Sequence, residues 1–248
     1  MLAIALNRRD YREFDQIISV YTQDHGRIDL LARGIKKITS KQSSHVEPFA
    51  LTDIVVAHGK EIDHLAKVQI IDYFVRIRED LLKSVAARYS VSLVEKLTHA
   101  RERDEKIFSS LKSWLDFLNR THLYNPLLVE GYIVTLLHCL GYTPELERCV
   151  VCGRKDGLTF FCASGGGVAC ETCGEEKKKA GEQVFGFGGE DRQTLRLLLS
   201  GDWTIVNAVR LEQNAADRIH RVVHEFLQFH SERRIGDLAR VIDFAAAA

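Results

Sequence analysis

The sequence predicts an α+β protein made of separate parts: a small antiparallel β-barrel, then a helical domain with a four-cysteine insertion. Three patterns predict this. Apolar residues alternate with a period of two over roughly the first 70 residues, and from Phe74 they recur every three or four residues. Four paired cysteines then interrupt the helical pattern. The 248 residues leave room for two or three such parts.

Five short apolar runs, separated by turn residues, make up the first part. Asp24-His25-Gly26 and His58-Gly59-Lys60 are two of the turns. The runs occupy positions 2–6, 15–22, 28–32, 49–57 and 62–71. Five strands in so short a stretch fit an OB-type barrel, and a five-stranded SH3-like barrel fits the pattern nearly as well. We therefore expect a barrel over residues 1–72, of either the OB type or the SH3-like type.

Helical periodicity follows the barrel. One run of apolar residues extends from Phe74 to Leu97, and a second covers positions 107–118. A third helix is expected to begin at Asn125-Pro126, an N-cap followed by proline at the first helical position, and to end at Gly141. These helices predict that residues 73–141 form the first part of a helical domain.

The second part of this domain is expected over residues 190–244. Apolar residues between Ile219 and Leu227 share one helical face there. Because helix precedes and follows residues 142–189, the cysteine-containing stretch is predicted to be an insertion in one helical domain.

The cysteines of this insertion have the spacing of a metal site. Cys149-x2-Cys152 and Cys170-x2-Cys173 are separated by 17 residues. Each C-x-x-C turn presents two thiolates to one side, and two such turns complete a tetrahedron around zinc. Four thiolates close the coordination shell, so we predict one structural Zn²⁺ per chain. A redox C-x-x-C is the alternative, but it usually occurs once, near a βαβ pattern that is missing here.

The two remaining cysteines, Cys139 and Cys162, are expected to be buried thiols, with a role as an alternative ligand left open for Cys162. No apolar run approaches the roughly 20 residues of a membrane span, and the amino end does not resemble a signal peptide. We therefore expect a cytoplasmic protein without a membrane partner, whose cysteines are reduced.

Basic residues gather locally, although the formal net charge of the chain is zero. One group flanks an aromatic residue near the amino end, and another follows the third predicted strand. Basic side chains and an aromatic on barrel loops suit a phosphate backbone and stacked bases, whereas a solvated basic loop is the alternative. The candidate nucleic-acid contacts are Arg8, Arg9, Tyr11, Arg12, Arg27, Arg33, Lys36, Lys37 and Lys41.

The sequence contains no pattern of residues that points to a catalytic site. The sequence contains neither a Gly-x-x-x-x-Gly-Lys-Ser/Thr phosphate loop nor a Gly-x-Ser-x-Gly nucleophile elbow. His220 and His224 are four residues apart, but the His-Glu-x-x-His order of metalloproteases is missing, so solvated or helix-facing histidines are expected. The sequence thus predicts a protein that is not an enzyme.

Several short segments, in a fixed order along the chain, point to a known family. They are Arg-Asp-Tyr-Arg-Glu-Phe-Asp at 9–15, His-Gly-Arg at 25–27, Ala-Arg-Gly-Ile-Lys-Lys at 32–37, Glu-Pro-Phe at 47–49, and Leu-Gly-Tyr at 140–142 followed by the first cysteine pair. In this order they resemble the bacterial recombination mediator family RecO, over essentially the whole chain.

The resemblance implies an N-terminal OB-fold, a helical domain and a zinc-binding module. It also implies binding to single- and double-stranded DNA, annealing of complementary strands, and a place at the nucleoid. The implied partners are RecR, RecF, RecA and single-strand-binding protein, with RecR helping to load RecA.

Two other functions remain open on the sequence alone. One is a zinc-containing scaffold that binds a protein through its helical domain, with only incidental DNA contact. The other is a zinc-dependent enzyme, against which the closed shell of four thiolates argues.

Overall fold

The computed structural model describes residues 1–37, 43–122, 124–231 and 234–237. They form two compact units, which divide between His122 and Leu123. Within these described ranges, every helix is too short or too polar to cross a membrane.

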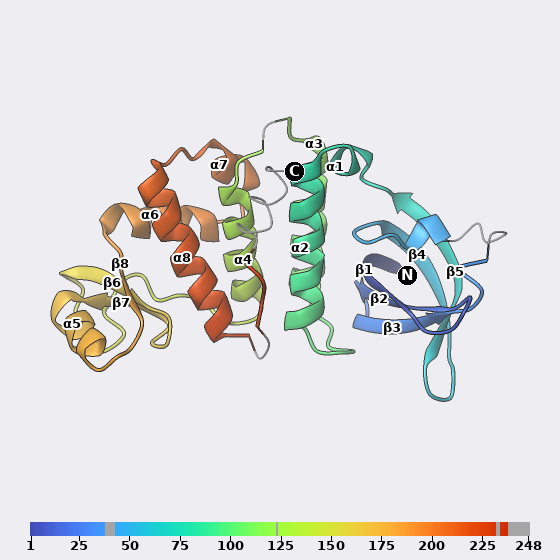
Figure 1. The fold of residues 1–248 in the computed structure, drawn as a ribbon, viewed down its shortest axis with the longest axis horizontal. Coiled ribbons are helices and arrows are strands. Elements are labelled where there is room, and N and C mark those ends of the chain that lie inside the picture. The colour runs from blue at the N-terminus through green and yellow to red at the C-terminus, as the bar shows by residue number, and fades with distance from the viewer. Residues whose placement is uncertain (38–42, 123, 232–233, 238–248) are drawn as a thin grey trace. The chain divides into compact units, whose positions relative to one another are not determined.

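A closed five-stranded barrel begins the first unit (Figure 1, blue). Its strands are β1 (Leu2–Asp10), β2 (Gln16–Thr22), β3 (Gly26–Ala32), β4 (Leu51–Ala57) and β5 (Asp63–Asp72). Their order is β1-β2-β3-β5-β4, with β4 paired back to β1 and only the β3–β5 pair parallel. This is the arrangement of an OB-fold, so the predicted barrel is confirmed and the SH3-like alternative is wrong.

Alternating side chains fill the barrel. The interior is lined by apolar residues from all five strands and from the 3-10 turn η1 (Ser43–Val46). Register shifts between Ala5 and Asn7 and between Val55 and Val56 mark bulges, which bend the strands so that the sheet can close. The buried interior residues include Ala3, Ile18, Val20, Leu30, Val46, Ile54 and Val68.

Three helices, α1 (Val75–Arg78), α2 (Leu81–Leu97) and α3 (Glu105–Arg120), complete the first unit. The single helix expected from Phe74 to Leu97 is split, which corrects that prediction. Phe74 has a left-handed backbone with φ 52°, and the Asp80 carboxylate accepts a hydrogen bond from the Lys83 backbone N–H, which caps a new helix.

Arg78 links these helices to the barrel. Its guanidinium carbon lies 4.1 Å from the centre of the Phe49 ring and 3.8 Å from that of Tyr73. The same group donates hydrogen bonds to the carbonyl oxygens of Pro48 and Tyr73. Such contacts explain why the compact unit extends to His122, although the barrel itself ends at β5.

Helices also form the frame of the second unit. They are α4 (Leu127–Cys139), α6 (Gly189–Leu199), α7 (Trp203–Ala208) and α8 (Gln213–Phe229). α4 contacts the other three helices and is buried around most of its circumference. The Asn125 side-chain oxygen accepts a hydrogen bond from the Leu127 backbone N–H, so the predicted start of this helix is nearly right.

Between α4 and α6 lies the cysteine module, as the sequence predicts (Figure 1, gold). It has a three-stranded sheet in the order β7-β6-β8 and one helix. The Phe161 ring packs edge-on against Phe187 and Phe226, which joins the module to α8. The elements are β6 (Leu158–Cys162), β7 (Gly167–Cys170), α5 (Glu171–Lys179) and β8 (Val184–Gly186).

Candidate metal centre and nucleic-acid surface

The four predicted ligands meet at one point of the cysteine module. Cys149 and Cys152 belong to the turn before β6, Cys170 ends β7, and Cys173 lies in the first turn of α5. Their sulfur atoms all lie within 4.8 Å of one another, and the Cys152 and Cys170 sulfurs are 3.8 Å apart. A tetrahedral zinc site with Zn–S distances of about 2.3 Å needs sulfurs about 3.8 Å apart, so the four residues fit this metal.

Backbone geometry shapes the first cysteine turn. Gly153 has φ 76° and donates its backbone N–H to the Cys149 carbonyl at 2.9 Å. The Val151 N–H points at the Cys149 sulfur at 3.4 Å. Glycine suits this position because its left-handed backbone carries no side-chain penalty.

The electrostatics of the cluster favour a bound cation. Burial raises the pKa of the Cys149 thiol, but N–H donors of Cys152, Cys170 and Val151 outweigh it and bring the pKa to about 6. A hydrogen bond with Cys170, together with burial, raises the pKa of Cys173 to about 12. Four thiolates this close repel one another, and a divalent cation at their centre removes that repulsion.

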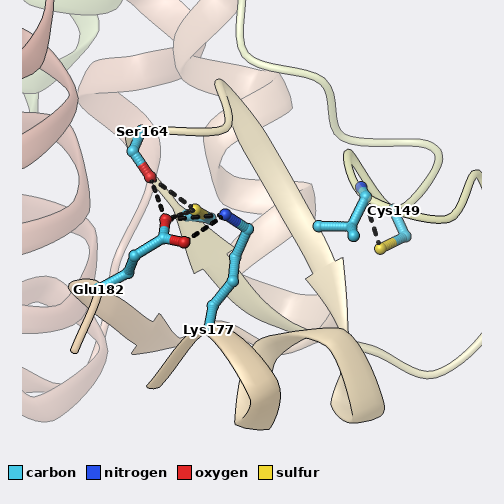
Figure 2. A network of polar contacts seen from close by, with 6 residues as sticks. Cys149, Ser164, Lys177 and Glu182 are labelled. Carbon is cyan, nitrogen blue, oxygen red and sulfur yellow. Dashed lines mark hydrogen bonds and ion pairs between the residues drawn. The ribbon is translucent and has the colours of Figure 1, made fainter. Parts of the chain in front are cut away.

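Cys162 belongs to a separate polar network. Its sulfur lies 3.2 Å from the Ser164 hydroxyl and 4.0 Å from a Glu182 carboxylate oxygen. Lys177 donates to the same carboxylate at 2.7 Å, and Figure 2 shows Ser164, Lys177 and Glu182 converging. Cys162 is therefore a packed thiol outside the four-sulfur cluster, and Cys139 is half-buried on α4.

On the first unit, two loops form one end of the barrel. The β1–β2 turn and the segment after β3 are joined by a hydrogen bond from the Gly34 N–H to the Asp15 carboxylate at 2.7 Å. A second bond runs from the Lys36 N–H to the Phe14 carbonyl at 3.1 Å. These bonds bring residues that are about 20 positions apart in the sequence onto one surface.

A cavity of about 400 Å³ opens between these two loops. Arg12, Phe14, Arg33 and Lys37 line it together with Glu13, Asp15 and Gly34, and we call the first four residues the cationic pocket. The ion pairs found among the described residues include none for Arg12, Arg33 or Lys37. Three positive charges are therefore available to an anionic ligand.

Two aromatic rings stand exposed beside these charges. Tyr11 is 49% exposed, with the Arg12 guanidinium 5.1 Å from its ring centre. Phe14 is 44% exposed, with the Lys37 ammonium 5.9 Å from its ring centre. Phe14 is missing from the predicted contacts, although its place in the same turn as Tyr11 could have pointed to it.

Four of the other predicted basic residues have protein partners. Arg8 pairs with Glu47, Arg9 with Asp29, and Lys36 with Asp10, at 2.8 to 2.9 Å. Arg27 donates to the Glu95 carbonyl of α2 at 2.6 Å, away from the cationic pocket. Lys41 lies outside the described residues. The exposed pairs of Arg9 and Lys36 contribute little stability, so both cations can exchange a carboxylate for a phosphate.

Comparison with known proteins identifies the family. Residues 1–74 match the domain described as Recombination protein O N terminal, and residues 78–239 match Recombination protein O C terminal. The chain belongs to the RecO family. The chain is 30% identical to the DNA repair protein RecO of Pelotomaculum thermopropionicum, over 99% of this chain and 94% of the relative. The DNA repair protein RecO of Syntrophomonas wolfei is 33% identical, over 69% and 68%.

The N-terminal RecO match ends at residue 74, between β5 and α1, and the C-terminal match begins at residue 78, the last residue of α1. The sequence resemblance to RecO is thus confirmed, together with the barrel, the helical region and the cysteine cluster. Family membership supports a role in DNA repair and recombination.

Proposed function

We propose that this RecO-family protein is a recombination mediator that binds single- and double-stranded DNA through the cationic pocket and anneals complementary strands. The observation that supports this most is a cluster of three cations, for which the described residues include no ion pair, beside exposed aromatic rings at one end of an OB-fold. OB-folds that bind single strands combine a basic groove with aromatic stacking surfaces in this way.

Annealing needs no covalent chemistry. Each strand carries one negative charge per phosphate, and repulsion between two strands slows their meeting. Arg12, Arg33 and Lys37 can neutralise phosphates of one strand and so lower the barrier to approach of the second. The proposed activity is therefore DNA binding and strand annealing rather than catalysis of bond cleavage.

The partners follow from the family. We propose that the protein acts with RecR, and with RecF, to help RecA load on DNA coated by single-strand-binding protein, in the cytoplasm at the nucleoid. The RecO match across both domains supports this assignment.

Charge reversal tests the DNA-binding proposal. The triple variant Arg12→Glu/Arg33→Glu/Lys37→Glu should bind single- and double-stranded oligonucleotides about a hundredfold more weakly at ~0.1 M salt, because three phosphate contacts become repulsive. Binding is measured by fluorescence anisotropy and annealing by the pairing of labelled complementary strands.

The matched control is Arg154→Glu/Lys155→Glu, which reverses exposed charges in the cysteine module. It should keep native affinity. If the triple variant also binds and anneals normally, DNA contact through this surface is wrong. A protein-interaction scaffold would still bind its protein partner with native affinity after the triple charge reversal.

We also propose that Cys149, Cys152, Cys170 and Cys173 hold one structural Zn²⁺. The fit of the four sulfurs to a tetrahedron supports this, and all four ligands come from the protein. The metal would hold the turn before β6, the end of β7 and the start of α5 together. Elemental analysis should find one zinc per chain; iron, or no metal after purification without chelators, would contradict the proposal.

A further inference from the structure

Phe14 is an unusual residue on the surface of the barrel. Phe49 and Phe74 in the same unit are fully buried, whereas Phe14 is 44% exposed and lines the cavity of the cationic pocket. Leaving a large ring in water gives up burial free energy, so an exposed ring among cations suggests a contact with a ligand.

Backbone hydrogen bonds, rather than packing of the ring, hold Phe14 in place. The N–H groups of Tyr11 and Arg12 donate to the Asp15 carbonyl at 3.1 and 3.3 Å, and the Asp15 N–H donates back to the Arg12 carbonyl. The Phe14 carbonyl in turn accepts from the Lys36 N–H. Main-chain hydrogen bonds thus fix the conformation of the turn. The Phe14 ring is held at the surface and is not part of the hydrophobic core.

The chemistry around the ring is that of a nucleotide site. Lys37 lies near the ring, and Arg12 and Arg33 line the same cavity, so a phosphate and a planar base can be bound side by side. The cavity of about 400 Å³ falls in the size range of small-ligand pockets. The carboxylates of Glu13 and Asp15 also line it and disfavour a phosphate next to them, which leaves the phosphate to the cations.

We propose that Phe14 stacks on an unpaired nucleobase, and that this contact gives the cationic pocket its preference for single-stranded over double-stranded DNA. The inference rests on the proposed DNA binding. In a duplex, neighbouring base pairs cover both faces of every base, so the ring has no free face to meet. Arg12, Arg33 and Lys37 contact phosphates of either form, whereas the Phe14 ring stacks only on an unpaired base.

Phe14→Leu tests this directly. Its affinity for a single-stranded oligonucleotide should fall about tenfold, the effect of losing one stacked base, while its affinity for the duplex stays unchanged. The slope of log affinity against log salt should remain that of the unaltered protein, because no charge is removed. Phe14→Trp should keep single-strand affinity, and its indole fluorescence should be quenched by single strands but not by duplex.

The matched control is Phe229→Leu, at a ring that is 54% exposed in the second unit, and it should bind both forms normally. Equal losses for single strands and duplex in Phe14→Leu, or no loss for either, would overturn the stacking proposal. Because Phe14 is outside the core, the unfolding temperature of Phe14→Leu should equal that of the unaltered protein. A lower unfolding temperature would mean that the ring stabilises the fold.

The two proposals fail in different ways. If the unaltered protein binds DNA with a salt dependence that the triple charge reversal removes, but Phe14→Leu behaves normally, only the stacking contact is wrong. If the triple reversal leaves binding intact, the DNA-binding surface itself is misplaced.

Discussion

Among single residues, His220 has an environment that the sequence does not reveal. Its Nδ1 lies 2.9 Å from the Glu130 carboxylate on α4, and its Nε2 lies 3.1 Å from Asp237, beyond the end of α8. Its ring stacks on His224, one turn along the same helix. The expectation of a solvated or helix-facing histidine missed both carboxylates, because they come from elements that helical periodicity does not place beside α8.

These contacts give the second unit a pH-dependent stability. The hydrogen bond with Glu130 raises the pKa of His220, against the opposing effect of burial, and Asp237 adds to the rise. Because the folded pKa exceeds the unfolded value of about 6.5, the stabilisation is fully present below that value. It is lost as the pH rises through the folded pKa.

His220→Gln should therefore destabilise the second unit more at pH 6 than at pH 9. Urea unfolding at the two pH values measures the difference. The control is His138→Gln, at an exposed histidine on α4. An equal loss of stability at both pH values in His220→Gln would mean that the ring contributes packing and no charge.

The same limit of sequence reasoning applies to the basic residues. Composition and spacing identify the cations near the barrel loops, but they do not show which ones a carboxylate neutralises. Arg8, Arg9 and Lys36 find partners at Glu47, Asp29 and Asp10. Such pairs depend on strand register, so the sequence alone could not separate them from Arg12, Arg33 and Lys37.

For secondary-structure elements, prediction succeeds where side chains alternate between a core and solvent. The five strands follow from this pattern and from the glycines in their turns. α5 and β8 were missed. Helix α5 buries only Cys173 and Gly174, so it has almost no apolar periodicity, and β8 spans three residues. The cysteine cluster stabilises α5, and pairing with β6 stabilises β8. Both are tertiary interactions.

The loop between α2 and α3 depends on a single glycine of the barrel. Gly26 begins β3 with φ 65°, and a Cβ atom there would overlap the carbonyl group of Glu102. The Arg101 N–H, in the same loop, donates to the Arg27 carbonyl at 2.8 Å. The absence of a side chain at Gly26 is what permits this close approach.

Gly26→Ala should destabilise the first unit by more than about 2 kcal/mol, since it combines an unfavourable backbone angle with a steric overlap. Unfolding is followed through Trp114 fluorescence in a Trp203→Phe background, because Trp203 belongs to the second unit. Gly34→Ala is the control: its φ of 64° is nearly the same, but its Cβ would meet only the flexible Lys37 side chain at 3.5 Å. Equal losses of unfolding free energy in the two variants would show that the backbone angle, and not the steric overlap, causes the destabilisation.

In the whole molecule, the cationic pocket and the cysteine cluster belong to different compact units. Cysteine spacing was enough to predict which four cysteines cluster, since C-x-x-C turns fix their own geometry. The pocket could be predicted only in part, because it forms where two loops from distant parts of the barrel sequence meet.

This separation predicts what loss of the metal should do. Cys149→Ser should abolish zinc binding and increase hydrogen exchange within residues 142–189, while DNA affinity stays within about twofold, because a four-thiolate zinc has a structural role. Cys139→Ser is the control and should retain the metal. Loss of DNA binding by Cys149→Ser, with the barrel still folded, would place the module in the DNA site.

The salt dependence of single-strand binding tests the central claim, that the cationic pocket neutralises DNA phosphates. If about five phosphates are contacted, log affinity should fall with log salt at a slope of roughly −3 to −4. The neutralised variant Arg12→Gln/Arg33→Gln/Lys37→Gln should then have a slope smaller in magnitude by about 2. An affinity that does not change with salt, or a slope that the three substitutions leave unaltered, would contradict the account.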